Sequence, residues 1–259
     1  MTVHTHRADG SEIVFDSFAH FHELIRDRAC PHFIYRGVQR FDYDLRPRIA
    51  RKLGSPTTKH TELNFYKAER SLFEIFRTRA ATHATDNGYT DWHWLTLAQH
   101  YGVATRLLDW TENPLVALYF ATLHSVDDTG KPTAIDEDGA VYVAHPSSLY
   151  VADSTSPFAN KRHGIFYAPH LTQRLIAQSA LFTIHTKPWE PFDDKHHIWK
   201  ARVTKAFKAD LVTTLPRYGF SRRTMYADFD SFATELDRFF ESHKYKMGRE
   251  FYIDVETDA

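Results

Sequence analysis

The segment TRLLDWTENPLVALYFA, residues 105–121, constrains the fold more than any other stretch of the chain. An extended apolar run, LLDW, leads into the polar turn TEN and then to Pro114, a residue favoured in the first turn of a helix. Thr111 or Asn113 is the expected N-cap, because either side chain can accept a hydrogen bond from a free backbone N–H. The segment therefore predicts a strand, a polar turn and a helix in direct succession.

Apolar spacing predicts further helices and strands on both sides of this unit. The expected helices lie within residues 11–28, 61–84, 91–102, 208–220 and 231–246. The expected strands lie within residues 32–37, 139–146, 180–186 and 200–207. Residues 41–54, which carry Arg46, Arg48, Arg51 and Lys52, and the poorly periodic residues 147–169 are expected to be loops.

The composition is that of a globular protein without a general attraction to polyanions. Hydrophobic residues make up 42% of the 259 residues, which is enough to bury a sizeable core. The 32 basic and 33 acidic side chains give a net charge of −1, so nucleic acid and anionic membranes are not attracted by the chain as a whole. Without repeats or low-complexity linkers, we expect one α+β domain over residues 1–259, with a core at about 15–240.

Cysteine and histidine usage argues against metal binding. Cys30 is the single cysteine, so an intrachain disulfide cannot form, and the thiol is expected to be incidental. The closest histidine spacings, at residues 4–6, 20–22 and 196–197, lack the HExxH pattern and a completing ligand. We therefore expect no metal.

The N-terminus, MTVHTHRADGSEIVF, lacks the basic and then apolar pattern of a signal peptide. No apolar run approaches the ~20 residues that a membrane span needs. We expect a cytoplasmic protein with no membrane partner.

The stretch HFIYRGVQR, residues 32–40, places Arg36 directly behind three apolar or aromatic residues. A strand normally turns its charges to water or ends before them. Arg36 is therefore either the solvated end of a strand or a guanidinium held in a cleft to bind something.

Three segments make the chain resemble the FRG domain family of bacteria and phages, which is named for its Phe/Tyr-Arg-Gly motif. They are YRG at 35–37, LAQHYGVATRLLDWTENPLVALYFA at 97–121 and RLIAQSALFTIH at 174–185. The resemblance extends over roughly residues 15–240. It departs from the family pattern at Ser179, where glycine is usual, and at residues 226–229, which read Tyr-Ala-Asp-Phe in place of a Pro-Asp-Leu stretch.

The order of these segments is also similar to that of ADP-ribosyltransferases of the arginine-serine-glutamate type. That similarity implies a central mixed, mostly antiparallel sheet flanked by helices. It implies an enzyme that binds NAD and transfers ADP-ribose to a protein or nucleic-acid acceptor, with a role as a toxin or in antiphage defence. The alternative is a non-catalytic module that binds a nucleotide or nucleic acid in the same cleft.

In this interpretation, Arg36 holds the NAD diphosphate, because a planar guanidinium donates two parallel charge-assisted hydrogen bonds. Gly37 would let the ligand approach the backbone closely. Gln178 stands where the similarity places the catalytic acid; it can bind a ribose hydroxyl but cannot act as a general base. Arg174, about one helical turn earlier, could contact a phosphate. For Gln178 a purely structural role, bonded to the backbone, remains the alternative.

Four further residues have a functional and a structural interpretation. Asp109 contacts ligand, caps the following helix, or pairs with Arg36 or with Arg106, a further candidate for cofactor binding. His100 takes part in proton transfer or is structural. Tyr101 and Trp110 stack on the nicotinamide or a base, or belong to the core.

Overall fold

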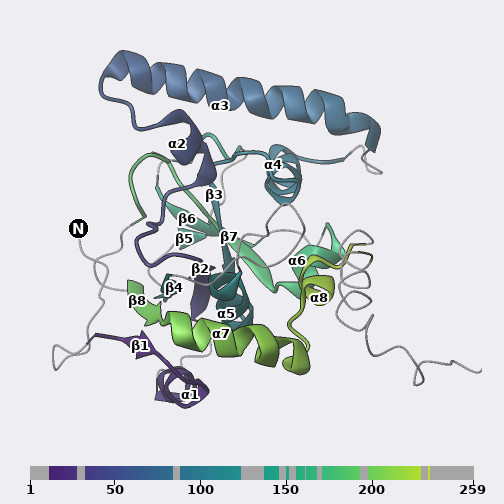
Figure 1. Ribbon diagram of the computed structural model, residues 1–259. Helices are drawn as coiled ribbons and strands as arrows, with labels where there is room; N and C mark the ends of the chain where they lie inside the picture. The colour runs from purple at the N-terminus through teal and green to yellow at the C-terminus, as the bar shows by residue number, and fades with distance from the viewer. Residues whose placement is uncertain are drawn as a thin grey trace, which may run out of the picture.

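The computed structural model describes residues 12–27, 33–83, 88–123, 137–145, 150–151, 156–160, 162–167, 171–192, 198–228 and 233. Within these residues the chain forms an eight-stranded sheet with helices packed against it (Figure 1). No helix in this part of the chain is both long enough and apolar enough to cross a membrane.

The sheet is mixed and mostly antiparallel, as the similarity in segment order implied. Its strands are β1 (Val14–Phe15), β2 (Ile34–Val38), β3 (Leu107–Thr111), β4 (Gly139–Ala144), β5 (Tyr150–Val151), β6 (Gly164–Phe166), β7 (Ala180–Ile184) and β8 (Ile198–Val203). They are arranged in the order β1-β8-β4-β2-β3-β7-β6-β5. The outer pairs β1–β8 and β5–β6 are parallel, and the pairs between them are antiparallel. The predicted α+β fold class is confirmed.

The two halves of the sheet meet at its centre in a very short pairing. Strand β2 pairs with β4 along its full length, and β3 pairs with β7 along its full length. Between β2 and β3, however, Tyr35 and Thr111 are the one pair in register. Because unpaired backbone groups need other partners, the edges that face each other here have to be satisfied by side chains, water or ligand.

Helices cover both halves of the sheet (Figure 1). They are α1 (Phe18–Asp27), α2 (Arg48–Leu53), α3 (Lys59–Ala80), α4 (Asp91–His100), α5 (Pro114–Thr122), α6 (Gln173–Ala177), α7 (Lys205–Thr214) and α8 (Arg222–Tyr226), with short 3₁₀ turns η1 (Ala81–His83) and η3 (Leu215–Tyr218). Helices α1, α5 and α7 pack against the β1-β8-β4-β2 half. Helices α3, α4 and α6 pack against β3 and β7.

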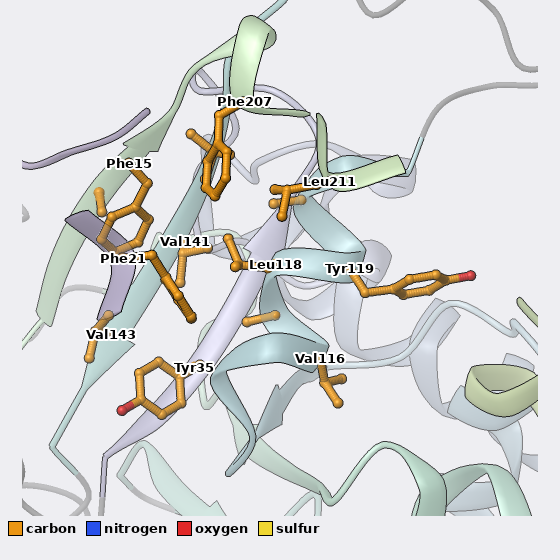
Figure 2. Close-up of a cluster of buried hydrophobic side chains, with 14 of the residues drawn as sticks. Phe15, Phe21, Tyr35, Val116, Leu118, Tyr119, Val141, Val143, Phe207 and Leu211 are labelled. Carbon is orange, nitrogen blue, oxygen red and sulfur yellow. The ribbon is translucent and has the colours of Figure 1, made fainter. Parts of the chain in front are cut away.

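The core under α5 follows from the two-residue period of the strands. In β4, Val141 and Val143 join the cluster with α5 and α7, whereas Tyr142 joins a second cluster on the other face of the sheet. Figure 2 shows Leu118 of α5 and Leu211 of α7 pointing into the first cluster. Both leucines are fully buried, so α5 is fixed firmly on β2 and β4.

The predicted strand, turn and helix unit is present as β3 and α5. Asn113, one of the two expected caps, accepts a hydrogen bond from Leu115 N at 2.9 Å. Thr111 accepts one from Asn113 N at 3.0 Å and so stabilises the turn itself. Local sequence signals were sufficient here because cap, proline and apolar run are adjacent in the chain.

Two segments expected to be loops contain regular structure, and one predicted helix lies almost entirely outside the described residues. Residues 41–54 include helix α2, and residues 147–169 include strands β5 and β6. These elements are too short to show a period, and β5 and β6 depend on pairing with each other and with β7. The predicted helix at 231–246 falls outside the described residues apart from residue 233, as does Cys30.

Candidate active site

A cavity of about 470 Å³ opens where β2 and β3 part. Both strands border it, together with the ends of α2, α4, α5 and α6. The lining residues are Tyr35, Arg36, Gly37, Arg48, Arg51, Gln99, His100, Tyr101, Gly102, Val103, Leu107, Leu108, Asp109, Trp110, Thr111, Val116, Phe120, Arg174 and Gln178. Its volume lies in the range of small-molecule and cofactor sites.

Arg36 occupies the gap between the two strands. Its Nη1 donates to the backbone oxygen of Asp109 at 2.6 Å, so the side chain replaces a missing strand-to-strand hydrogen bond. The same nitrogen lies 3.5 Å from Asp109 Oδ2. Burial lowers the pKa of Arg36, and Arg51 lowers it further, while Asp109 opposes the shift. Arg36 still carries its charge, since arginine does not deprotonate in proteins.

One nitrogen of Arg36 is left without a partner. The side chain is 14% exposed, and Nε is buried with no hydrogen-bond partner among the described residues. A buried donor without a partner costs roughly 1–3 kcal/mol. An acceptor supplied by a ligand or by water would remove that cost.

Asp109 is held from one side by a short chain of hydrogen bonds. Leu107 N donates to Thr105 Oγ1 at 3.1 Å, and the Thr105 hydroxyl donates to Gln99 Oε1 at 2.6 Å. This fixes the orientation of the Gln99 amide, whose Nε2 donates to Asp109 Oδ2 at 2.9 Å. The carboxylate is therefore anchored through Oδ2, while the side chain as a whole is 55% exposed.

Gln178 caps the C-terminal end of helix α6 and lines the cavity beside the end of β3. Its Nε2 donates to the backbone oxygen of Met225 at 3.0 Å, and its own backbone oxygen accepts from Thr111 Oγ1 at 2.6 Å. Ser179 follows with a left-handed φ of 44°, a conformation that glycine adopts at little cost. That backbone conformation is the physical reason why a glycine would suit this position better than serine.

The charge lining the cavity is strongly positive. In the part of the chain that the structure describes, four guanidinium groups line it against the single carboxylate of Asp109; they belong to Arg36, Arg48, Arg51 and Arg174. Arg48 donates to Gly102 O at 2.5 Å, which ties α2 to the end of α4. A concave surface with this charge attracts anions.

His100 and Tyr101 form one rim of the cavity. His100 Nδ1 lies 3.4 Å from Thr172 Oγ1, and the Tyr101 ring meets the His100 ring edge-on with centroids 4.8 Å apart. Burial and the charge of Arg174 lower the pKa of His100, while Asp228 opposes them. Tyr101 is 70% exposed, so its ring is open to a planar ligand group.

Of the predicted site residues, Arg36, Gly37, His100, Tyr101, Asp109, Arg174 and Gln178 line this one cavity. Of the two partners proposed for Asp109, the structure selects Arg36. The alternative that Arg36 is the solvated end of a strand is wrong, because its side chain is only 14% exposed. Asp109 does not cap α5, because Asn113 is the cap.

Arg106 does not reach the cavity, contrary to expectation. It is almost fully buried and forms a two-pronged ion pair with Glu69 of α3, with Nε donating to Oε1 at 2.8 Å and Nη2 to Oε2. Glu69 already neutralises its charge, so the residue stabilises the contact between α3 and the sheet.

Trp110 is a core residue, and the stacking role expected for it is wrong. Its ring is buried on the face of the sheet opposite α4, with Nε1 donating to Thr183 Oγ1 at 3.0 Å. It borders the cavity, but its indole is fully engaged within the core.

Gly37 is required by the helix behind it. A Cβ on Gly37 would lie 1.8 Å from Ala117 O and 2.7 Å from Ala121 N, both in the backbone of α5. The absence of a side chain therefore permits the close approach of α5 to β2, while Gly37 also borders the cavity.

The sequence did not single out Arg48, Arg51 and Thr105 as parts of the site, whereas Gln99 was, like His100, open to a functional or a structural role. The cluster of basic residues within 46–52 could have drawn attention to Arg48 and Arg51, but no sequence pattern near them indicates that they lie beside β2. Gln99 and Thr105 gain their role from a hydrogen-bond chain that only the fold creates.

Residues 31–129 match the FRG domain family. The match covers less of the chain than the motifs suggested, but it contains β2, α2, α4, β3 and α5 and so most of the cavity wall. Gln178 and Arg174 of α6 complete the cavity from outside the matched FRG segment. No curated protein and no solved structure matches the chain.

Proposed function

We propose that the cavity binds NAD and that the protein transfers ADP-ribose from it to an acceptor. The observation that carries the proposal is that Arg36, Asp109 and Gln178, from three separate segments, line one cavity.

The arginines supply the means to hold the diphosphate. Arg36 is fixed at the bottom of the gap between β2 and β3, with one donor free. Arg48, Arg51 and Arg174 stand around it on α2 and α6. Guanidinium groups donate paired, charge-assisted hydrogen bonds to phosphate oxygens, which lysine cannot reproduce.

The remaining polar groups suit the sugar and the base. Gln178 is held at the cavity wall by Met225 O, where its amide can bind a ribose hydroxyl. Tyr101 offers an open aromatic face at the rim for nicotinamide or adenine. An activity that consumes NAD or modifies macromolecules suits a toxin or an antiphage effector.

Release of nicotinamide tests the proposal. Wild-type protein incubated with nicotinamide-labelled NAD and cell lysate is expected to release label, and Arg36→Ala is expected to lose that activity. Hydrogen bonds to charged groups contribute about 1.5–3 kcal/mol, which corresponds to about 10- to 150-fold in affinity. Arg51→Ala, which alters an exposed side chain of the same cavity, is expected to weaken NAD binding without disturbing the core.

Arg77→Ala is the matched control, since Arg77 is an exposed arginine on α3 away from the cavity. It is expected to behave as wild type. Wild-type protein that releases no nicotinamide with any acceptor in the lysate would exclude the transferase.

A second function, nucleotide binding without turnover, is favoured by one observation. The Gln178 side chain is an amide bonded to backbone, and an amide cannot act as a general base. This function predicts thermal stabilisation by NAD or another nucleotide without product, worth about 2.7 kcal/mol at 100 times the Kd.

A further inference from the structure

We infer that Asp109 is the general base of this site, and that its Oδ1 takes the proton from the acceptor as the ADP-ribosyl group is transferred. The inference rests on the proposed function, because it assigns a step of that reaction. It explains how a cavity with glutamine at position 178 can still activate an acceptor.

The two oxygens of the Asp109 carboxylate have different surroundings. Oδ2 accepts from Gln99 Nε2 at 2.9 Å and lies 3.5 Å from Arg36 Nη1. Oδ1 makes no hydrogen bond with the described residues, and the side chain is 55% exposed at the cavity. One oxygen anchored and the other free is the arrangement that a positioned base requires.

The orientation of the Asp109 carboxylate is specific because the chain of hydrogen bonds that holds it starts at a backbone N–H. Leu107 N and the Thr105 hydroxyl determine which end of the Gln99 amide faces Asp109. Gln99 therefore presents its NH₂ group to Oδ2 and orients the carboxylate. Gln99 acts as a positioning residue.

The other candidates for the base are less suitable. Gln178 has an amide, which does not accept a proton at neutral pH. His100 is half-buried beside Arg174, and both factors lower its pKa, so its ring binds a proton less readily. Its Nδ1 also faces Thr172 at the cavity wall. Among the described residues, Asp109 is the one carboxylate that lines the cavity.

The step balances without a further reactant. The bond between the ribose C1′ and the nicotinamide nitrogen breaks, and its electron pair stays on that nitrogen, which leaves as neutral nicotinamide. A new bond forms between C1′ and the acceptor oxygen. The acceptor proton passes to Asp109 Oδ1 and from there to water. With water as acceptor the products are nicotinamide, ADP-ribose and a proton.

An acceptor that carries no proton distinguishes a role of Asp109 as general base from a purely structural role. Azide attacks C1′ as an anion and needs no base. In Asp109→Asn we expect transfer to water to fall by about 10²- to 10⁴-fold, the usual contribution of general base catalysis, while formation of the ADP-ribosyl azide continues near the wild-type rate. Gln99→Leu is expected to reduce transfer to water in part and to spare transfer to azide.

Glu112→Gln is the matched control, because Glu112 is an exposed carboxylate just after β3 that does not line the cavity. It is expected to match wild type with both acceptors. Loss of both reactions in Asp109→Asn, at unchanged NAD affinity, would overturn the inference, and so would retention of both. Wild-type protein that releases no nicotinamide with either acceptor overturns the proposed function as well, so the two failures are distinguishable.

Discussion

Replacing Gly37 by alanine tests how closely α5 approaches β2. The new Cβ would lie 1.8 Å from Ala117 O, and a tolerable 3.0 Å requires α5 to retreat by about 1.2 Å. Helix α5 has nine residues, so it is about 14 Å long and about 10 Å wide. A retreat along its whole length would open up to about 170 Å³, which costs about 4 kcal/mol at about 24 cal/mol per Å³.

Urea denaturation measures this cost. With a slope of about 3 kcal/mol per M, the midpoint of Gly37→Ala is expected to fall by about 1.3 M at unchanged slope. Gly219→Ala is the control, because Gly219 has a φ of 86° but no atom within 4 Å of the added Cβ. It is expected to lose only about 1–2 kcal/mol, the cost of a left-handed backbone. A Gly37→Ala loss no larger than that of Gly219→Ala would refute the close contact.

Three further predictions concern stability. Ser179→Gly removes the cost of a left-handed φ of 44° and is expected to stabilise the protein by about 1 kcal/mol in urea, whereas Ser179→Ala should not. Arg106→Met is expected to destabilise by about 3–5 kcal/mol because it leaves the buried Glu69 unpaired, and adding Glu69→Leu should recover most of the loss; no recovery would contradict the pairing. Burial, and then the charge of His163, hold the pKa of the buried His185 well below its usual value. At low pH the unfolded chain therefore binds one proton more than the folded chain. The free energy of unfolding should fall as the pH drops below about 6.5, by up to about 1.4 kcal/mol per pH unit. His185→Gln should flatten that dependence in urea titrations between pH 7.5 and 5, and an unchanged slope would contradict the assignment.

The parts of the fold that the sequence predicted are those whose signals are local. Asn113, Pro114 and the apolar run after them are adjacent, so the start of α5 could be found without knowledge of the rest. Strands β5 and β6 were missed because two or three residues carry no period, and their stability comes from pairing at long range.

At the site, sequence patterns identified many of the residues but not which neighbours their side chains contact. Asp109 was expected to pair with Arg36 or Arg106. The choice is decided by Glu69, far away in the chain on α3, which neutralises Arg106 and leaves Arg36 to Asp109. Likewise, no local signal indicates that Gly37 faces a helix.

Calorimetric titration of NAD into the protein tests the central claim, that the gap between β2 and β3 is a dinucleotide site. The wild type is expected to bind NAD saturably with one molecule per chain. Arg36→Ala is expected to bind about 10- to 150-fold more weakly, as the loss of hydrogen bonds to a charged group predicts. The Arg77→Ala control should match the wild type. Absence of NAD binding by the wild type, or equal affinity in Arg36→Ala, would contradict the account.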